Sequence, residues 1–122
     1  AIAAQAEMIQ ISSITARGID AACPATLSLA VIQGILRDEL GFTGVIATAS
    51  LRSPAVTNAY DAGEAAVLAL QAGADVLLLP EDLEAAVLCI HQALRQGDLT
   101  EERIDESVAR ILALKIQAGL IR

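Results

Sequence analysis

Three short runs of mostly apolar residues constrain the fold of this chain more than any other feature. They cover residues 8–14 (MIQISSI), 44–48 (GVIAT) and 76–79 (VLLL), and helical patterns separate them. Apolar runs with little alternation are typical of strands buried on both faces, as in parallel sheets. The order strand, helix, strand, helix, strand, helix therefore predicts right-handed crossovers and a parallel α/β sheet.

The helices expected between the runs cover residues 29–40, 62–72 and 83–96, and a glycine follows each of them. Ser28 is the expected cap of the first helix. After residue 97 the pattern predicts a short helical turn capped by Thr100, and then a longer helix over 105–118. We interpret the charges near that start as a solvated helix end. Residues 1–5 resemble the tail of a helix, and residues 15–26 are expected to be irregular.

The composition excludes several classes of function. Hydrophobic residues make up 55% of the chain and aromatic residues 2%, so the core is built from small aliphatic side chains. The formal net charge is -7 and no basic cluster is present, which argues against nucleic acid and anionic membranes as partners. No apolar run approaches the ~20 residues of a membrane span, and no export signal is visible. Cys23 and Cys89 have no metal-site spacing, which favours reduced thiols, packing of Cys89 in its helix, and a cytoplasmic location.

Three parallel strands form a thin sheet with two unpaired edges. We therefore interpret residues 1–122 as a single domain that is part of a larger barrel or completes its sheet by self-association.

Four segments carry a resemblance to a known family. They are PATLS at 24–28, VIQGILRDELGFTGVI at 31–46, GEAAVLALQAGADVLLLPEDLEAA at 63–86 and TEERIDESVARILALK at 100–115. In this order they closely resemble glycoside hydrolase family three, and TASL at 48–51 is nearer to its β-N-acetylhexosaminidase branch than to its β-glucosidase branch. The resemblance implies a partial (β/α)8 barrel that comprises the last three β/α units.

The resemblance also implies where catalytic groups belong. The family's nucleophilic aspartate follows the Ser or Thr at the end of the Gly-Val-Ile strand, and here that position is Ala49. An alanine forms no glycosyl ester, and Ser50 has no evident base beside it. Ser13 replaces the histidine that commonly follows the first of these strands, and Gln10 replaces an apolar residue. Ser13 and Ser50 remain as weak candidates for sugar binding. The family's acid/base loop lies in barrel segments that this chain lacks.

Other candidate residues have simpler structural interpretations. His91 lies within a predicted helix and is expected at its surface. Asp82 is expected to cap a helix, although Glu81 and Asp82 could form a pair at the barrel mouth. Asp61 and Glu64 suit a helix start, and Asp75 is expected to bond turn amides. Gly63 and Gly73 are isolated, so no phosphate loop, cofactor or metal site is predicted.

Three hypotheses follow. The first is a catalytically inactive, structural or self-assembling partial barrel. The second is one half of a split retaining glycosidase that hydrolyses terminal β-N-acetylglucosaminides with a partner chain. The third is a relic that binds an N-acetylglucosamine-type sugar.

Overall fold

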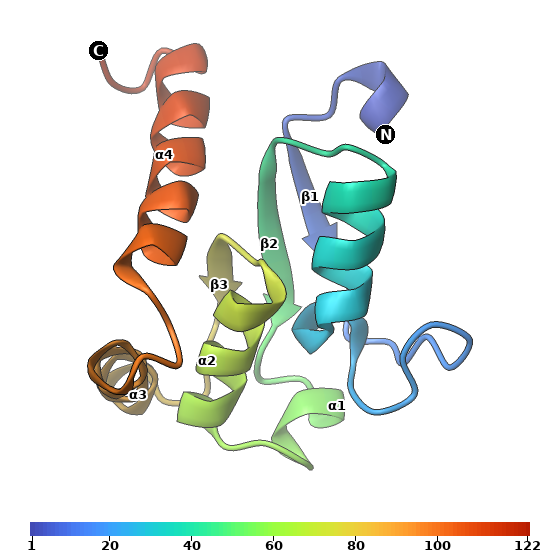
Figure 1. Ribbon diagram of the computed structural model, residues 1–122, viewed down its shortest axis with the longest axis vertical. Helices are drawn as coiled ribbons and strands as arrows, with labels where there is room; N and C mark the ends of the chain where they lie inside the picture. Colours follow the sequence, from blue (N-terminus) through green and yellow to red (C-terminus); the bar gives the residue numbers. More distant parts are fainter.

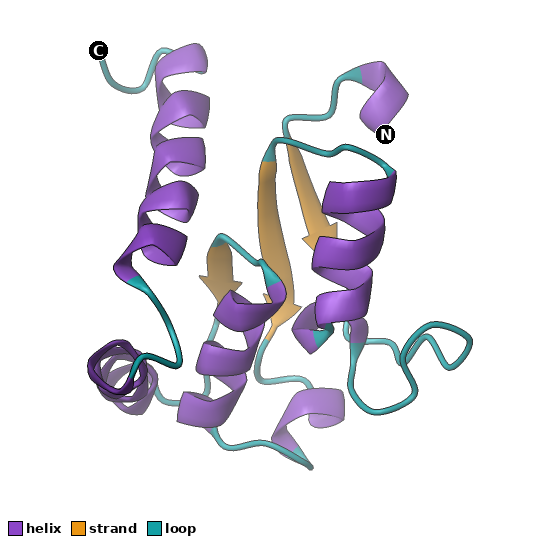
Figure 2. Ribbon diagram, in the orientation of Figure 1, coloured by secondary structure: helices purple, strands orange, loops and turns teal.

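The sheet has three parallel strands, β1 (Met8–Ile11), β2 (Val45–Ser50) and β3 (Val76–Leu78), with β2 in the centre. Figure 2 shows the strands with helices around them in this computed structural model, which describes residues 1–122. The predicted parallel α/β fold class is therefore confirmed. The outer edges of β1 and β3 have no strand partner within the chain.

The lengths of two strands differ from the prediction. Strand β1 pairs with β2 only from Met8 to Ile11, and the predicted extension to residue 14 is wrong. The carbonyl of Ile14 instead accepts the N–H of Ala25 at 2.8 Å, which closes the loop on itself. Strand β2 continues to Ser50, two residues beyond the prediction, because it also pairs with β3 there.

The helices that connect the strands begin and end close to the predicted residues. Helix η3 (Ala30–Glu39) follows β1, α2 (Ala62–Ala72) follows β2, and α3 (Leu83–Gln96) follows β3. The local sequence explains the ends of α2 and α3. An aspartate caps the start of each of these helices, and a glycine in the left-handed conformation closes its end. Helix η3 is wound more widely than an α-helix, and its last bond runs from Leu40 N–H to Ile35 C=O. Two 3₁₀ turns, η1 (Ile2–Ala4) and η2 (Ala25–Leu27), precede β1 and η3.

Two helical features differ from the prediction. A short helix, α1 (Pro54–Thr57), lies in the segment expected to be a loop, and it starts at a proline, which is favoured in the first helical turn. Helix α4 (Glu101–Gln117) is one continuous helix, whereas a turn followed by a second helix was expected. Thr100 caps it as predicted, by accepting the N–H of Arg103 at 3.1 Å, and no residue after that cap interrupts the helix.

The main core lies between the sheet and the helices η3 and α2. Ile46 of β2 packs in one cluster with Ile32 of η3 and with the buried alanines Ala65 and Ala69 of α2. Small side chains allow α2 to approach the sheet closely, which agrees with the aliphatic core inferred from composition. A second cluster comprising Leu70, Ala93 and Leu99 joins α2 to α3.

Helix α4 stands beside the sheet and returns toward the end of the molecule where the N-terminus also lies (Figure 1). It contacts the body mainly near β2. No helix of the structure is both long enough and apolar enough to cross a membrane.

Candidate functional site at the carboxyl edge of the sheet

The three parallel strands deliver their last residues to one edge of the sheet, which is the arrowhead end in Figure 1. Active sites of (β/α)8 barrels lie at this edge. Ala49 and Ser50 end β2, Ser13 follows β1 by two residues, and Leu79 follows β3 directly. The predicted candidate residues are thus brought to a common edge, although no hydrogen bond joins the side chains of Ser13 and Ser50.

Two threonine hydroxyls fix the backbone around Ala49. Thr26 Oγ1 accepts the N–H of Ala49 at 3.3 Å, and Thr48 Oγ1 accepts the N–H of Leu78 at 2.9 Å. The side chain of Thr48 thereby replaces a strand-to-strand backbone bond, and the β2–β3 register shifts between Ala47 and Ser50. Position 49 is consequently held in a defined geometry, but its methyl group can donate, accept or attack nothing.

The residue after β3 has an unusual backbone conformation. Leu79 has φ 49°, in the left-handed region that residues with a Cβ rarely adopt. Such a conformation costs roughly 1–2 kcal/mol, and it recurs at functional edges. Sequence reasoning missed Leu79, because VLLLP is an uninterrupted apolar run that gives no sign of a turn before the proline.

The hydroxyls of the two candidate serines differ in their surroundings. Ser50 Oγ accepts the N–H of Arg52 at 3.3 Å, so it serves the turn that follows β2. Ser13 Oγ is buried and has no hydrogen-bond partner. A buried hydroxyl left unsatisfied costs roughly 1–3 kcal/mol, so Ser13, like Ser53 in the turn after β2, has unused bonding capacity.

The remaining candidates have the structural roles expected of them. His91 is exposed on α3. Asp82 accepts the N–H of Ala85 at 2.9 Å and Asp61 accepts that of Glu64 at 2.8 Å, which are both cap bonds. No three His, Cys, Asp or Glu side chains lie close enough together to hold a metal ion. Both cysteines are free thiols.

A polar cluster closes the loop between β1 and η3. Asp20 accepts the hydroxyl of Ser28 at 2.6 Å and the thiol of Cys23 at 3.3 Å. The Ser28 bond is the main cause that lowers the pKa of the Asp20 carboxyl. Burial, followed by the neighbouring Asp20, raises the pKa of Cys23, so this thiol is a poor nucleophile. Ser28 also accepts the N–H of Val31 at 3.3 Å, consistent with its predicted place at the start of the helix.

The largest charged cluster lies at the opposite, amino edge of the sheet, around Asp75. Its carboxylate accepts from Arg37 at 2.7 Å, from Arg110 at 2.9 Å and from the Ser107 hydroxyl at 2.7 Å. It also accepts the N–H of Ile46 at 2.9 Å. The expectation that Asp75 bonds turn amides was therefore wrong, because three of its four partners are side chains and the fourth is the N–H of Ile46 within β2.

The arginines of this cluster join the sheet to η3 and α4. Arg37 also donates to the carbonyls of Phe42 and Gly44, and Arg103 donates to those of Leu70 and Ala74. Burial lowers the pKa of both guanidinium groups, which nevertheless remain charged at neutral pH. The cluster is a structural anchor, since its arginines bond carbonyls and the Asp75 carboxylate of the protein itself and it lies away from the carboxyl edge.

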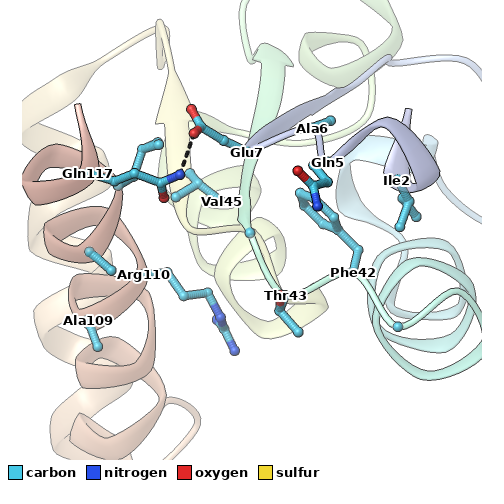
Figure 3. A pocket seen from close by; sticks show the side chains of 14 residues that line it. Ile2, Gln5, Ala6, Glu7, Phe42, Thr43, Val45, Ala109, Arg110 and Gln117 are labelled. Carbon is cyan, nitrogen blue, oxygen red and sulfur yellow. Dashed lines mark hydrogen bonds between the residues drawn. The ribbon is translucent and has the colours of Figure 1, made fainter.

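A cavity of about 610 Å³ also lies at the amino edge, between α4 and the starts of β1 and β2. Figure 3 shows Arg110 and Gln117 projecting from α4 toward Thr43 and Glu7, with Gln117 bonded to Glu7 at 2.6 Å. Because the cavity is at the far end from Ala49 and Ser13, its size does not identify it as the active site.

Comparison with known proteins identifies the family of this chain. The sequence profile described as "Glycosyl hydrolase family 3 N terminal domain" matches residues 1–114. The chain belongs to glycoside hydrolase family 3. The resemblance carried by the four sequence segments is thereby confirmed, and the fold is a partial barrel of this family.

Solved structures and curated relatives agree with the family. The structure of a family 3 β-N-acetylglucosaminidase from Paenibacillus sp. str. FPU-7 superposes with a TM-score of 0.92 at 39% identity, over 97% of this chain and 23% of that one. A β-N-acetylglucosaminidase/β-glucosidase of Cellulomonas fimi is 32% identical over 99 residues, which is 81% of this chain. A β-hexosaminidase of Mycobacterium tuberculosis is 30% identical over 88% of this chain.

The chain spans only a small part of these family 3 relatives. It covers 18% of the Cellulomonas protein and 29% of the Mycobacterium protein. The family therefore accounts for a sheet of three strands with open edges, since a complete barrel closes eight strands into a ring.

Proposed function

We propose that this chain is a catalytically inactive partial barrel of the β-N-acetylhexosaminidase type, with a structural or self-assembling role. The proposal rests on the alanine at position 49. From the family resemblance, the nucleophilic carboxylate is expected at this position, and a retaining glycosidase forms its glycosyl ester on that carboxylate. Without it, the first displacement has no attacking group.

The surroundings of Ala49 support this interpretation. Hydrogen bonds to the hydroxyls of Thr26 and Thr48 fix the backbone at the end of β2. The strand end is therefore ordered, although position 49 carries no carboxylate. The neighbouring Ser50 hydroxyl is engaged by the N–H of Arg52. The one histidine of the chain is exposed on α3, and no hydrogen bond joins it to either serine.

Self-association follows from the sheet. Strands β1 and β3 each leave an open edge, and exposed strand edges pair with other chains unless something covers them. Measuring the molar mass of the chain by light scattering checks this part. A monomer at every concentration would remove the self-assembling role.

The split-enzyme hypothesis requires a nucleophile at position 49. In it, a partner carrying the preceding five β/α units would complete the barrel, and this chain would contribute to the hydrolysis of terminal β-N-acetylglucosaminides. The short coverage of the relatives favours some completing segment, but Ala49 belongs to this chain and stays without a carboxylate whatever docks against it.

A hydrolysis assay separates the two proposals. Chromogenic β-N-acetylglucosaminide is offered to the unmodified chain, to Ala49→Asp and to the matched Ala49→Asn control, each with and without the preceding segment of a relative. We expect turnover only from Ala49→Asp with the added segment. Turnover by the unmodified chain would overturn the proposed inactivity.

The sugar-binding hypothesis has one supporting observation, which is the buried, unpartnered hydroxyl of Ser13 at the carboxyl edge. A ligand hydroxyl could satisfy it. Titration with N-acetylglucosamine tests this, because a ligand that binds only the folded chain raises Tm, by an amount that grows with its concentration. A Tm that stays constant up to high sugar concentration excludes the relic.

A further inference from the structure

Helix α4 carries an apolar stripe on the side that faces away from the protein. Val108, Leu112 and Ile116 follow one another at four-residue spacing, and their side chains are 45%, 44% and 55% exposed. Residues at this spacing lie above one another on a helix surface. The stripe is therefore continuous and about two turns long.

The opposite side of the same helix is the one tied to the body. Arg103 and Arg110 make the hydrogen bonds that hold α4 to α2, to Ala74 before β3 and to Asp75. At about 100° per residue, Leu112 lies about 180° from Arg103 and about 160° from Arg110. These polar contacts fix the rotation of α4, so the apolar stripe is held facing outward and cannot turn inward.

The acidic residues of α4 gather near its start. The first turns carry Glu101, Glu102, Asp105 and Glu106 with one basic residue, Arg103, whereas the rest of the helix carries Arg110 and Lys115 and no acidic residue. Two copies of such a helix attract each other when they run antiparallel, because the acidic end of one meets the basic end of the other. A parallel pair would place like charges together.

We propose that this stripe is a self-association surface whose occupant is helix α4 of a second copy, running antiparallel across a two-fold axis at Leu112. In this arrangement Val108 of one copy lies opposite Ile116 of the other, and Leu112 lies opposite itself. Contact of a patch with its own copy is the isologous geometry of two-fold dimers. The inference rests on the proposed self-assembly, but it assigns a surface distinct from the strand edges.

The size of the contact predicts its strength. A 17-residue helix is about 25 Å long, and one helix pair buries less than the roughly 1,600 Å² of a standard interface. The dimer is therefore weak and concentration-dependent, and it weakens in salt because its orientation depends on exposed charges.

Light scattering over a concentration series tests the inference with the unmodified chain and three variants. The unmodified protein is expected to double its mass at high concentration, whereas Leu112→Glu and Leu112→Lys stay monomeric, because each puts a charge opposite an identical charge. An equimolar mixture of these two variants is expected to associate again. Circular dichroism shows whether each variant keeps its helix content and Tm, and recovery in the mixture itself excludes misfolding.

The matched control is Leu88→Glu, which changes an exposed leucine on α3. It is expected to dimerise like the unmodified chain. Loss of the dimer in this control, or failure of the mixture to recover, would overturn the proposed surface. A dimer that survives Leu112→Glu would also overturn it and leave pairing of strand edges as the route of self-assembly. A chain that is monomeric at all concentrations would overturn both.

Discussion

Replacing Asp75 with asparagine removes the negative charge that pairs with Arg37 and Arg110 at the amino edge of the sheet. The carboxylate is fully buried and accepts four hydrogen bonds, two of which are ion pairs with Arg37 and Arg110. An asparagine keeps one acceptor oxygen and turns an NH₂ group toward either Arg37 or Arg110, both of which can only donate. Removing one partner of a buried ion pair costs about 3–5 kcal/mol, because the remaining charges stay buried without compensation.

Urea unfolding followed by circular dichroism measures the effect, since the chain has no tryptophan to report by fluorescence. The loss of about 3–5 kcal/mol is a large share of the roughly 5–15 kcal/mol that stabilises a typical domain. The matched control is Asp82→Asn, because asparagine caps a helix about as well as aspartate, so the free energy of unfolding should change little. A loss below about 1 kcal/mol for Asp75→Asn would refute the role of this cluster as the anchor of η3 and α4.

Further predictions concern the packing of α2 on α3 and the response of the loop before η3 to pH. Gly63→Ala should destabilise the chain by about 1–3 kcal/mol in urea unfolding, because a Cβ there collides with Cys89, whereas Gly34→Ala, with open space around it, should be neutral or stabilising. A destabilisation by Gly34→Ala equal to that by Gly63→Ala would contradict this. Ser28→Ala should raise the pKa of Asp20 toward its ordinary value in an NMR titration. Because the folded pKa of Asp20 is depressed, the contribution of Asp20 to stability is present above the unfolded pKa and is lost as the pH falls through the folded pKa. An unchanged Asp20 titration in Ser28→Ala would rule out the Ser28 hydrogen bond as the cause of the lowered pKa.

The parts of the fold that could be predicted from the sequence are those decided locally. Helices α2 and α3 begin and end at the predicted residues because an aspartate caps each start and a glycine closes each end. Strand β1 was predicted too long because pairing with β2, and not apolarity, ends it at Ile11. Helix α1 was missed although Pro54 follows a serine, a pattern that often starts a helix.

For the candidate site, the family resemblance supplied the positions Ala49 and Ser13, and both lie at the carboxyl edge of the sheet. The Asp75 cluster was not predictable, because its side-chain partners Arg37, Ser107 and Arg110 lie 38, 32 and 35 residues away along the chain. Nothing in the local sequence distinguishes such a carboxylate from one that bonds turn amides. The orphaned hydroxyl of Ser13 and the strain at Leu79 likewise depend on how the strand ends come together.

The central claim is that position 49 leaves this barrel segment without the chemistry of its family. The most direct measurement is release of chromophore from a β-N-acetylglucosaminide by the unmodified chain mixed with the preceding barrel segment of a relative. We expect release at the uncatalysed rate at every chain concentration, with turnover only when Ala49→Asp replaces the unmodified chain. Release that rises in proportion to the concentration of the unmodified chain would contradict it.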